Sequence, residues 1–296
     1  MFKAFGRRSA VLAALLATGL ALTATSATAA TARDAAPASA GHPAVIGGSV
    51  ATEPYPFMAS FRLREEPDHH CGGALIASDW VVTAAHCKGL MKPGKTQVRI
   101  GSPDRDKGGV LTSIKRVITH PTWDRQGWGD FEGDLALVEL DRQVDLEPIR
   151  IAEGPGRVGE PSRIIGWGME CEDRENPTCA NGSEQLQELD TVRVPDRRCL
   201  SLDRGAELCA GDRDGRAASA CNGDSGGPQI RKVNGRWELI GATSRDGDDM
   251  GERMDGSAGC STNPEGGPGV GIWTDVTHHR SWIAATTGED LSAKLP

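Results

Sequence analysis

The sequence predicts an all-β protein, built as a sandwich or a barrel, and three observations predict it. Short apolar or alternating segments recur from residue 57 to residue 276 of the 296-residue chain. The 38 glycines and 17 prolines supply turn residues between those segments. A helical period of 3.6 residues is almost absent, and many short strands separated by turns are typical of all-β folds.

The predicted strands up to residue 165 are short. Two apolar runs, 74–76 and 80–82, flank Ser78-Asp79, which predicts a turn between adjoining strands. Residues 97–100 alternate between polar and apolar, as a half-buried strand does. The other segments of this part that predict strands are 57–63, 114–118, 135–140 and 163–165.

The C-terminal part predicts a hairpin and one more strand. Asn234-Gly235 separates the stretches 229–230 and 237–240, and this dipeptide is a strong hairpin signal. Residues 269–276 predict the further strand.

One helix is predicted near the end of the chain. Thr277 is a suitable N-cap for a helix over 278–285, whose inner face would carry Trp282 and Ile283. Residues 289–296 predict a loose tail.

The first 30 residues predict a secretory signal peptide rather than part of the fold. A charged start that includes Arg7-Arg8 precedes the apolar run 10–22, which is too short to span a bilayer. Ala27-Thr28-Ala29 has the small-x-small form of a cleavage site. The arginine pair leaves a twin-arginine signal open. No later stretch is long and apolar enough to be transmembrane, so no membrane contact is expected once the signal is removed.

Residues 31–44 are rich in Ala, Thr, Pro and Gly without a period, and they predict a flexible pro-segment. The predicted export also gives the eight cysteines a meaning. An even set in an exported chain predicts up to four disulfides, although eight cysteines allow roughly a hundred pairings. Their spacing does not resemble that of a zinc ribbon, so a structural zinc site is not expected.

The net charge of −8 argues against nucleic acid or an anionic membrane surface as a partner. Residues 1–44 contain four basic residues and one acidic residue, a net of +3, so residues 45–296 carry −11. The length after the leader is enough for a large core in one or two domains. A monomer is expected.

Three separated stretches contain the residue types that acyl transfer needs. Cys221-Asn222-Gly223-Asp224-Ser225-Gly226-Gly227-Pro228 presents a serine between glycines, whose backbone freedom lets N–H groups converge on a developing oxyanion. The serine hydroxyl needs a base, and imidazole, here in Thr83-Ala84-Ala85-His86-Cys87, titrates near neutral pH. Asp134-Leu135-Ala136-Leu137 offers a carboxylate that can orient the ring. Taken singly, each motif also fits a turn or a structural residue.

In their chain order, His86 then Asp134 then Ser225, these motifs resemble those of the chymotrypsin/trypsin-like serine peptidases. The resemblance extends from residue 45 to about residue 283 and includes Val45-Ile46-Gly47-Gly48 and Ile165-Gly166-Trp167-Gly168. It implies two six-stranded antiparallel β-barrels with the active site between them, followed by a C-terminal helix. The peptidase domain would comprise residues 45–288. It would hydrolyse protein or peptide substrates through an acyl-enzyme intermediate and without a cofactor.

The resemblance also assigns roles to the reacting residues. His86 would be the general base and acid, Asp134 would orient it, and Ser225 would be the nucleophile. The backbone N–H groups of Gly223 and Ser225 would form the oxyanion hole.

A zymogen is implied in the same way. A cut after Ala44 would free the amine of Val45, which would pair with Asp224, so the precursor would need an activating protease. The family often has Arg or Lys before this cut, and a protease that prefers small residues fits Ala44 better.

The disulfide pairing follows from the resemblance as well. Three pairs correspond to family positions, and the last two cysteines, which are close in sequence, predict a local pair. The implied disulfides are Cys71–Cys87, Cys199–Cys209, Cys221–Cys260 and Cys171–Cys179.

The specificity pocket is implied to be open and neutral. Ser219 corresponds to the pocket floor, where an aspartate would select Arg and Lys, and Gly269 corresponds to a wall position that a small residue keeps open. Large apolar or aromatic side chains are therefore favoured. Ser244 corresponds to a residue that binds the substrate backbone. Arg245-Asp246 replace the usual Trp-Gly after it, so that Asp246 would narrow the pocket mouth or add a negative charge.

Two features leave alternatives open. The insert 246–259 is rich in carboxylates, which suits calcium as well as a solvated loop. The adjacent pairs His69-His70 and His278-His279 would point their side chains apart, so neither pair predicts a metal site and both predict surface histidines.

Two other functions fit parts of the sequence. A catalytically silent binding module on the same fold usually lacks the His or Ser that this chain keeps. Gly223-Asp224-Ser225-Gly226-Gly227 also fits the Gly-x-Ser-x-Gly pattern of α/β-hydrolase esterases, but in that fold His follows Ser, whereas His86 comes first here. The sequence therefore predicts a secreted, extracellular serine endopeptidase.

Overall fold

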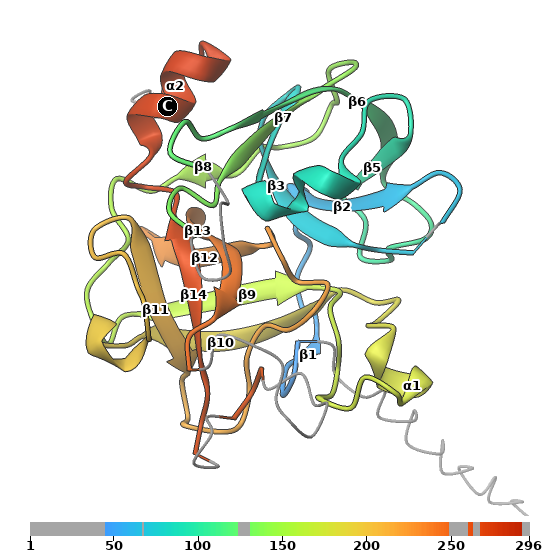
Figure 1. The fold of residues 1–296 in the computed structure, drawn as a ribbon. Coiled ribbons are helices and arrows are strands. Elements are labelled where there is room, and N and C mark those ends of the chain that lie inside the picture. The colour runs from blue at the N-terminus through green and yellow to red at the C-terminus, as the bar shows by residue number, and fades with distance from the viewer. Residues whose placement is uncertain (1–44, 67, 124–130, 249–259, 263–266, 292–296) are drawn as a thin grey trace, which may run out of the picture. The chain divides into compact units, whose positions relative to one another are not determined.

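Two six-stranded β-barrels and a C-terminal helix make up the chain from residue 45 onward (Figure 1), as predicted. The computed structural model describes residues 45–66, 68–123, 131–248, 260–262 and 267–291. The predicted signal peptide and pro-segment lie outside the described residues.

The first barrel is closed by antiparallel pairing of strands that the sequence patterns predict. Around the ring the strands are β2 (Met58–Leu63), β3 (Cys71–Ala77), β4 (Trp80–Thr83), β7 (Ala136–Leu140), β6 (Val110–Thr119) and β5 (Thr96–Ile100). A short 3-10 helix, η1 (Ala85–Leu90), follows β4 and carries His86. The barrel therefore delivers His86 directly from the end of a core strand.

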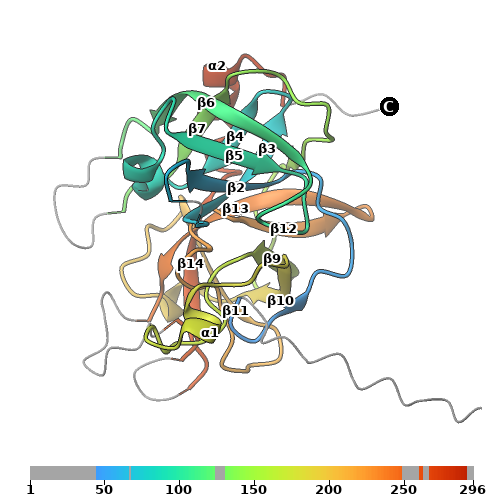
Figure 2. The same cartoon turned by 90° about the vertical axis from the view of Figure 1, so that its right-hand side faces the viewer.

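The second barrel follows the first in the chain, and its ring closes where β12 pairs with β9. Around the ring the strands are β9 (Pro161–Gly166), β10 (Gln187–Arg193), β11 (Glu207–Asp212), β14 (Val270–Asp275), β13 (Arg236–Asp246) and β12 (Pro228–Val233). Two short strands extend it, with β1 (Ser49–Val50) pairing β10 and β8 (Arg150–Ile151) pairing β13 in parallel. The remaining helices are α1 (Pro177–Ala180), η2 (Asp196–Arg198) and α2 (Arg280–Thr287). The barrels lie one above the other in Figure 2.

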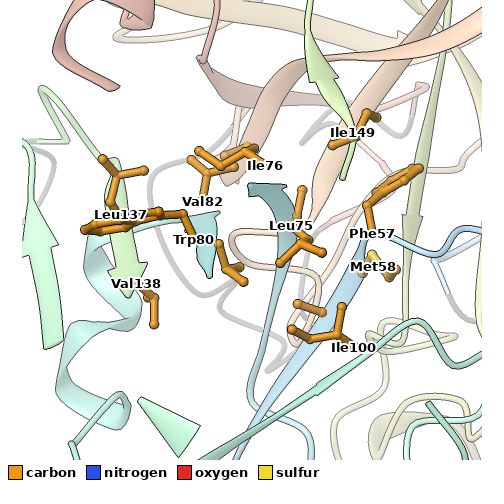
Figure 3. Close-up of a cluster of buried hydrophobic side chains, with 14 of the residues drawn as sticks. Phe57, Met58, Leu75, Ile76, Trp80, Val82, Ile100, Leu137, Val138 and Ile149 are labelled. Atoms are coloured by element: carbon orange, nitrogen blue, oxygen red, sulfur yellow. The ribbon is translucent and has the colours of Figure 1, made fainter. Parts of the chain in front are cut away.

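One apolar core extends through the first barrel and into the contact with the second. Figure 3 shows Leu75, Ile100 and Leu137 among the side chains that gather between the strands, and none of the three is accessible to solvent. Ile165 and Leu239 of the second barrel belong to the same buried cluster. This shared core holds the two barrels in a fixed relation, which any site between them requires.

The Asn234-Gly235 hairpin turn is confirmed between β12 and β13. Asn234 has φ +51° and Gly235 has φ +80°, and two consecutive positive values are the signature of the two-residue turn that this dipeptide favours. The backbone twist of such a turn matches the twist of the strands it joins, and this match fixes the register of β12 and β13.

The predicted helix begins later than expected, at Arg280, because Thr277 is not its N-cap. The Asp275 side chain accepts hydrogen bonds from Thr277 N at 2.8 Å, Thr277 Oγ1 at 2.6 Å and His278 N at 3.1 Å. These bonds hold residues 275–278 in a turn, so the helix starts only after His279.

The prediction that His279 lies at the surface is wrong. Only 7% of its area is exposed, and its ring lies 4.5 Å from that of His120 and 4.9 Å from that of His278, between ring centroids. Its Nε2 is buried and has no hydrogen-bond partner among the described residues. Burial, followed by the neighbouring His120 and His278, lowers the pKa of His279 to about 4.

We expect His279 to contribute to a loss of stability in acid. The unfolded chain, in which the pKa is about 6.5, takes up the proton before the folded chain does, so the free energy of unfolding should fall as the pH falls from about 6.5 to about 4. His279→Gln should make that decline shallower, as measured by urea unfolding at a series of pH values. His278→Gln should change the decline less, because His278 is exposed and only adds to the effect of burial on His279. Equal slopes for wild type and His279→Gln would contradict this account.

Candidate active site

Strand pairing brings His86 and Asp134 together. His86 follows β4 and Asp134 precedes β7, and these strands pair with Thr83 opposite Ala136. Ser225 lies in the loop before β12, and its carbonyl accepts a hydrogen bond from Gly72 N of β3 at 2.8 Å. The first barrel thus supplies the imidazole and the carboxylate, while the second supplies the hydroxyl.

Asp134 is a fully buried carboxylate with three hydrogen-bond donors. His86 Nδ1 lies 2.8 Å from Oδ2, His86 N donates to Oδ1 at 2.9 Å, and Ser244 Oγ donates to Oδ2 at 2.6 Å. Burial alone would raise the pKa of Asp134, but the charge of His86 and the bonds from His86 and Ser244 outweigh it and hold that pKa below its ordinary value. The carboxylate therefore stays ionised and fixes the ring with Nε2 facing away from it.

The loop around Ser225 leaves two backbone donors unused. Neither Gly223 N nor Ser225 N has an acceptor within the described part of the chain, whereas Asp224 N donates to Cys221 O at 2.9 Å. Gly223 has φ +96°, a conformation that favours glycine, and a Cβ there would come within 2.9 Å of Gly168 Cα. One free N–H group belongs to Ser225 itself and the other to Gly223, two residues before it, as an oxyanion site needs.

The Ser225 hydroxyl makes no hydrogen bond to His86 or to any other described residue. Such contacts are commonly loose before substrate binds and tighten in the reacting complex. The geometry thus joins acid to ring directly, and leaves the hydroxyl free beside two donors.

His69 bonds to the loop that carries Ser225, although the sequence predicted a surface residue. Its Nε2 donates to Gly223 O at 2.8 Å, so Nδ1 accepts from Ser60 Oγ at 2.7 Å. Burial lowers the pKa of His69 to about 4, and the ring is neutral in this arrangement. The only sequence signal was its place two residues before Cys71, which does not distinguish a buried ring from an exposed one.

Asp224 is buried, and no cationic side chain of the described residues pairs with it. Only 2% of the area of this residue is exposed. Its carboxylate accepts hydrogen bonds from Gly168 N and Cys221 N, each at 2.9 Å. Burial raises its pKa to about 7, and the two N–H bonds only partly oppose that rise. Gly166 and Gly168 pack against it so closely that a Cβ at Gly166 would lie 2.0 Å from Oδ1.

Val45, the predicted partner of Asp224, is also fully buried. Ile46, the next residue, accepts a hydrogen bond from Ser219 N at its carbonyl, at 3.0 Å. In the uncut chain Val45 N is a peptide nitrogen, so it carries no charge to offer Asp224. Val45 also has φ +56°, a strained conformation for a β-branched residue.

A cavity of about 120 Å³ opens beside Ser225. Ser219, which is 4% exposed, lines this cavity together with the Cys221–Cys260 disulfide. Ser244 and Asp246 also line it, as the sequence predicts, and Asp246 Oδ1 accepts Asp248 N at 2.9 Å.

Several lining residues were not predicted, among them Gly271 and Trp273, and one predicted residue, Gly269, is absent from the described lining. Gly271 and Trp273 line the cavity, and a Cβ on Gly271 would come 2.7 Å from the Trp273 ring. Gly269 is not among the described lining residues; its N donates to Ser261 O at 2.9 Å, and a Cβ there would meet the Ser261 backbone. Both glycines therefore serve close packing, Gly269 against the Ser261 backbone and Gly271 against the Trp273 ring.

The Arg245 side chain forms one wall of this cavity. Its guanidinium pairs with both carboxylate oxygens of Glu207, at 2.5 and 2.8 Å, and lies 4.9 Å over the ring of Phe131. Phe131 in turn meets the His86 ring edge-on at 6.4 Å between centroids. The bidentate pair neutralises the arginine, so the wall is polar in composition but carries little net charge.

All four implied disulfides are present. The bonded pairs are Cys71–Cys87, Cys171–Cys179, Cys199–Cys209 and Cys221–Cys260. Cys71–Cys87 ties β3 to the helix η1 that carries His86, and so limits movement of the imidazole.

Neither a metal site nor a membrane span is found in the part of the chain that the structure describes. Within those residues no group of three or more His, Cys, Asp or Glu side chains is placed to hold a metal ion. Most of the acidic insert, residues 249–259, lies outside the described residues, so calcium there stays a prediction. No described helix has the length and apolar character to cross a bilayer.

Comparison with known proteins gives consistent matches. The sequence model of the trypsin family matches residues 45–283. Mannan-binding lectin serine protease 1 of Homo sapiens is 30% identical over 274 residues, which is 84% of this chain but 35% of that protein, so the chain spans about a third of its length. Trypsin of Sarcophaga bullata is 30% identical over 256 residues, 83% of this chain and 89% of that protein.

A solved structure agrees. The structure of neuropsin, a serine protease expressed in the limbic system of mouse brain, superposes with a TM-score of 0.65 at 27% identity. The match covers 82% of this chain and 99% of that one.

Proposed function

The chain belongs to the trypsin family and is a serine-type endopeptidase, and on this premise we propose that it is exported as an inactive precursor and cleaves after apolar or aromatic side chains. We assign the chemistry to His86, Asp134 and Ser225. The observation that carries this assignment is the hydrogen bond from His86 Nδ1 to the buried Asp134 carboxylate, next to a serine loop with two unused N–H groups.

The reaction uses these groups in sequence. Ser225 Oγ attacks the carbonyl carbon of the scissile bond while His86 Nε2 takes the hydroxyl proton, and the N–H groups of Gly223 and Ser225 bind the oxyanion. His86 returns the proton to the leaving amine, which departs as the acyl-enzyme forms. Water, deprotonated by His86, then releases the acid and restores Ser225. Asp134 holds the ring in one tautomer throughout.

The pocket chemistry supports the side-chain preference. Among the described lining residues the base carries the Ser219 hydroxyl and no carboxylate, and Trp273 and the Cys221–Cys260 disulfide add apolar surface. Asp246 accepts Asp248 N at Oδ1 and lies in the lining together with Arg245, whose charge is opposite in sign. A partly apolar cavity with the Ser219 hydroxyl in its lining favours an uncharged substrate side chain.

Export and activation have separate support. The predicted signal peptide and the four disulfides fit an oxidising compartment. A cut before Val45 would create the cation that Asp224 lacks and would release the strained φ of Val45. The substrates would be proteins or peptides, and the partner in activation would be a protease that cuts after Ala44.

Ser225→Ala should abolish peptide hydrolysis and labelling by an organophosphonate, because the acyl-enzyme cannot form without Oγ. Unfolding midpoint and circular dichroism should match those of wild type, which serves as the folding control. Turnover above that of a blank by the variant would remove Ser225 from the mechanism.

Cleavage before Val45 should switch the activity on. The purified precursor is expected to hydrolyse peptides at least about a hundredfold more slowly than the cut form, because Asp224 is unpaired until the amine appears. N-terminal sequencing identifies the cut, and peptide turnover before and after it measures the gain. A precursor as active as the cut protein would disprove the zymogen proposal.

Peptides that differ only in the residue before the cut test the pocket. We expect kcat/KM to be at least about tenfold higher for Phe, Tyr or Leu than for Arg or Lys at that position, since burying an unpaired cation is costly. Preference for Arg or Lys would refute the assignment of Ser219 as a neutral base of the pocket.

A further inference from the structure

We propose that Glu172, held in place by the Cys171–Cys179 disulfide, is a positioning residue that fixes the wall of the specificity pocket. This inference rests on the proposed peptidase function. Glu172 touches neither the cavity beside Ser225 nor the reacting side chains, so it acts through the backbone that follows Cys260.

Glu172 binds that backbone with one carboxylate oxygen. Oε1 accepts Ser261 N at 2.8 Å and Ser261 Oγ at 2.6 Å, and lies 3.4 Å from Thr262 Oγ1. Hydrogen bonds to a carboxylate are stronger than bonds between neutral groups, and Ser261 is only 4% exposed, which limits competition from water. Cys260, the residue before Ser261, lines the cavity and is bonded to Cys221.

Ser261 is held from its other side by Gly269, the residue before β14. Gly269 N donates to Ser261 O at 2.9 Å, and the backbones approach so closely that a Cβ on Gly269 would lie 2.8 Å from Ser261 C. Gly271, two residues further along, lines the cavity. Glu172 therefore holds the segment after Cys260 close to β14, the strand that contributes Gly271 to the cavity lining.

The same short segment of chain also contacts the serine loop. Gly168 N donates to Asp224 Oδ1 at 2.9 Å and Met169 N donates to Asn222 O at 2.8 Å. Met169 packs in one buried cluster with the Cys221–Cys260 disulfide and Ile46. Residues 168–172 thus connect the loop that carries the nucleophile to the pocket wall.

The disulfide explains why Glu172 can hold this position. Cys171 precedes Glu172 directly and is bonded to Cys179, whose residue is 4% exposed, and Glu170 N donates to Cys179 O at 3.0 Å. A covalent link of separation 8 restricts the loop and so lowers the entropy lost when Glu172 binds Ser261. Nothing in the mechanism uses this disulfide otherwise.

The test compares alanine substitutions in the cut, full-length protein. Glu172→Ala should raise KM for a peptide with Phe before the cut by about tenfold, with kcat changed much less, because the lost bonds position the pocket rather than the reacting groups. A peptide with Ala at that position should be affected less, so the ratio of the two kcat/KM values falls. Glu172→Gln keeps an acceptor and should restore most of the ratio.

Glu175→Ala is the matched control, since Glu175 belongs to the same loop and its exposed carboxylate makes no hydrogen bond or ion pair with a described residue. The double variant Cys171→Ala/Cys179→Ala should lower the ratio in the same direction as Glu172→Ala. If Glu172→Ala does not fold, Ser261→Ala removes one donor only and should give a smaller shift in the same direction.

The outcomes separate this inference from the proposed function. Wild-type protein that is cut before Val45 and cleaves no peptide would defeat the proposed function. Active wild type together with a Phe-to-Ala ratio in Glu172→Ala, or in Ser261→Ala, equal to that of Glu175→Ala would overturn the role of Glu172. A lower melting temperature with an unchanged ratio would assign Glu172 to stability alone and would equally overturn it.

Discussion

This structure depends on one constraint: the Asp134 carboxylate is buried away from water and must be satisfied by protein groups. Asp134 can remain charged only because His86 and Ser244 satisfy it. His86 comes from η1, Asp134 from the entry to β7, and Ser244 from β13 of the other barrel. Thr274 Oγ1 adds a bond to the Asp134 carbonyl at 2.8 Å. The two barrels must therefore meet at this point for the charge to be stable.

The second buried carboxylate shows what happens when that condition is not met. Asp224 has two N–H donors but no cation among the described residues, and burial raises its pKa to about 7, whereas the pKa of Asp134 is lowered. The difference lies in the partners, since both groups are buried to a similar degree. Under the proposed activation, the freed amine of Val45 would supply a positive charge to Asp224.

Much of this arrangement could be predicted from the sequence, because it depends on local signals. The Asn234-Gly235 turn and the alternating strands of the first barrel follow from backbone preferences. The disulfide pairing followed from the family resemblance rather than from spacing. The strands Gln187–Arg193 and Glu207–Asp212 were not predicted, since both contain acidic residues whose partners lie elsewhere in the fold. Glu188 and Asp190 pair with Arg163, and Glu207 pairs with Arg245.

What the sequence did not show depends on tertiary contacts. The surroundings of His69 and His279 come from distant parts of the chain, since His69 bonds to Gly223 O and the His279 ring packs against that of His120. The start of α2 depends on which donors Asp275 captures. Gly271 and Trp273 enter the pocket because β14 pairs with β13 in a register that no local pattern specifies. The predicted site residues could be named from sequence motifs, whereas the residues that support them could not, because those contacts join distant parts of the chain.

The central claim is that Asp134, held ionised in the core, makes His86 a competent base for Ser225. The most direct measurement is kcat of Asp134→Asn in the cut protein, with a peptide that the wild type cleaves and with unfolding curves recorded in parallel. Asparagine preserves the shape but stabilises the wrong tautomer of the ring, so the account predicts a loss of about 10⁴-fold in kcat with the fold retained. A folded variant that retains kcat within about tenfold of wild type would contradict it.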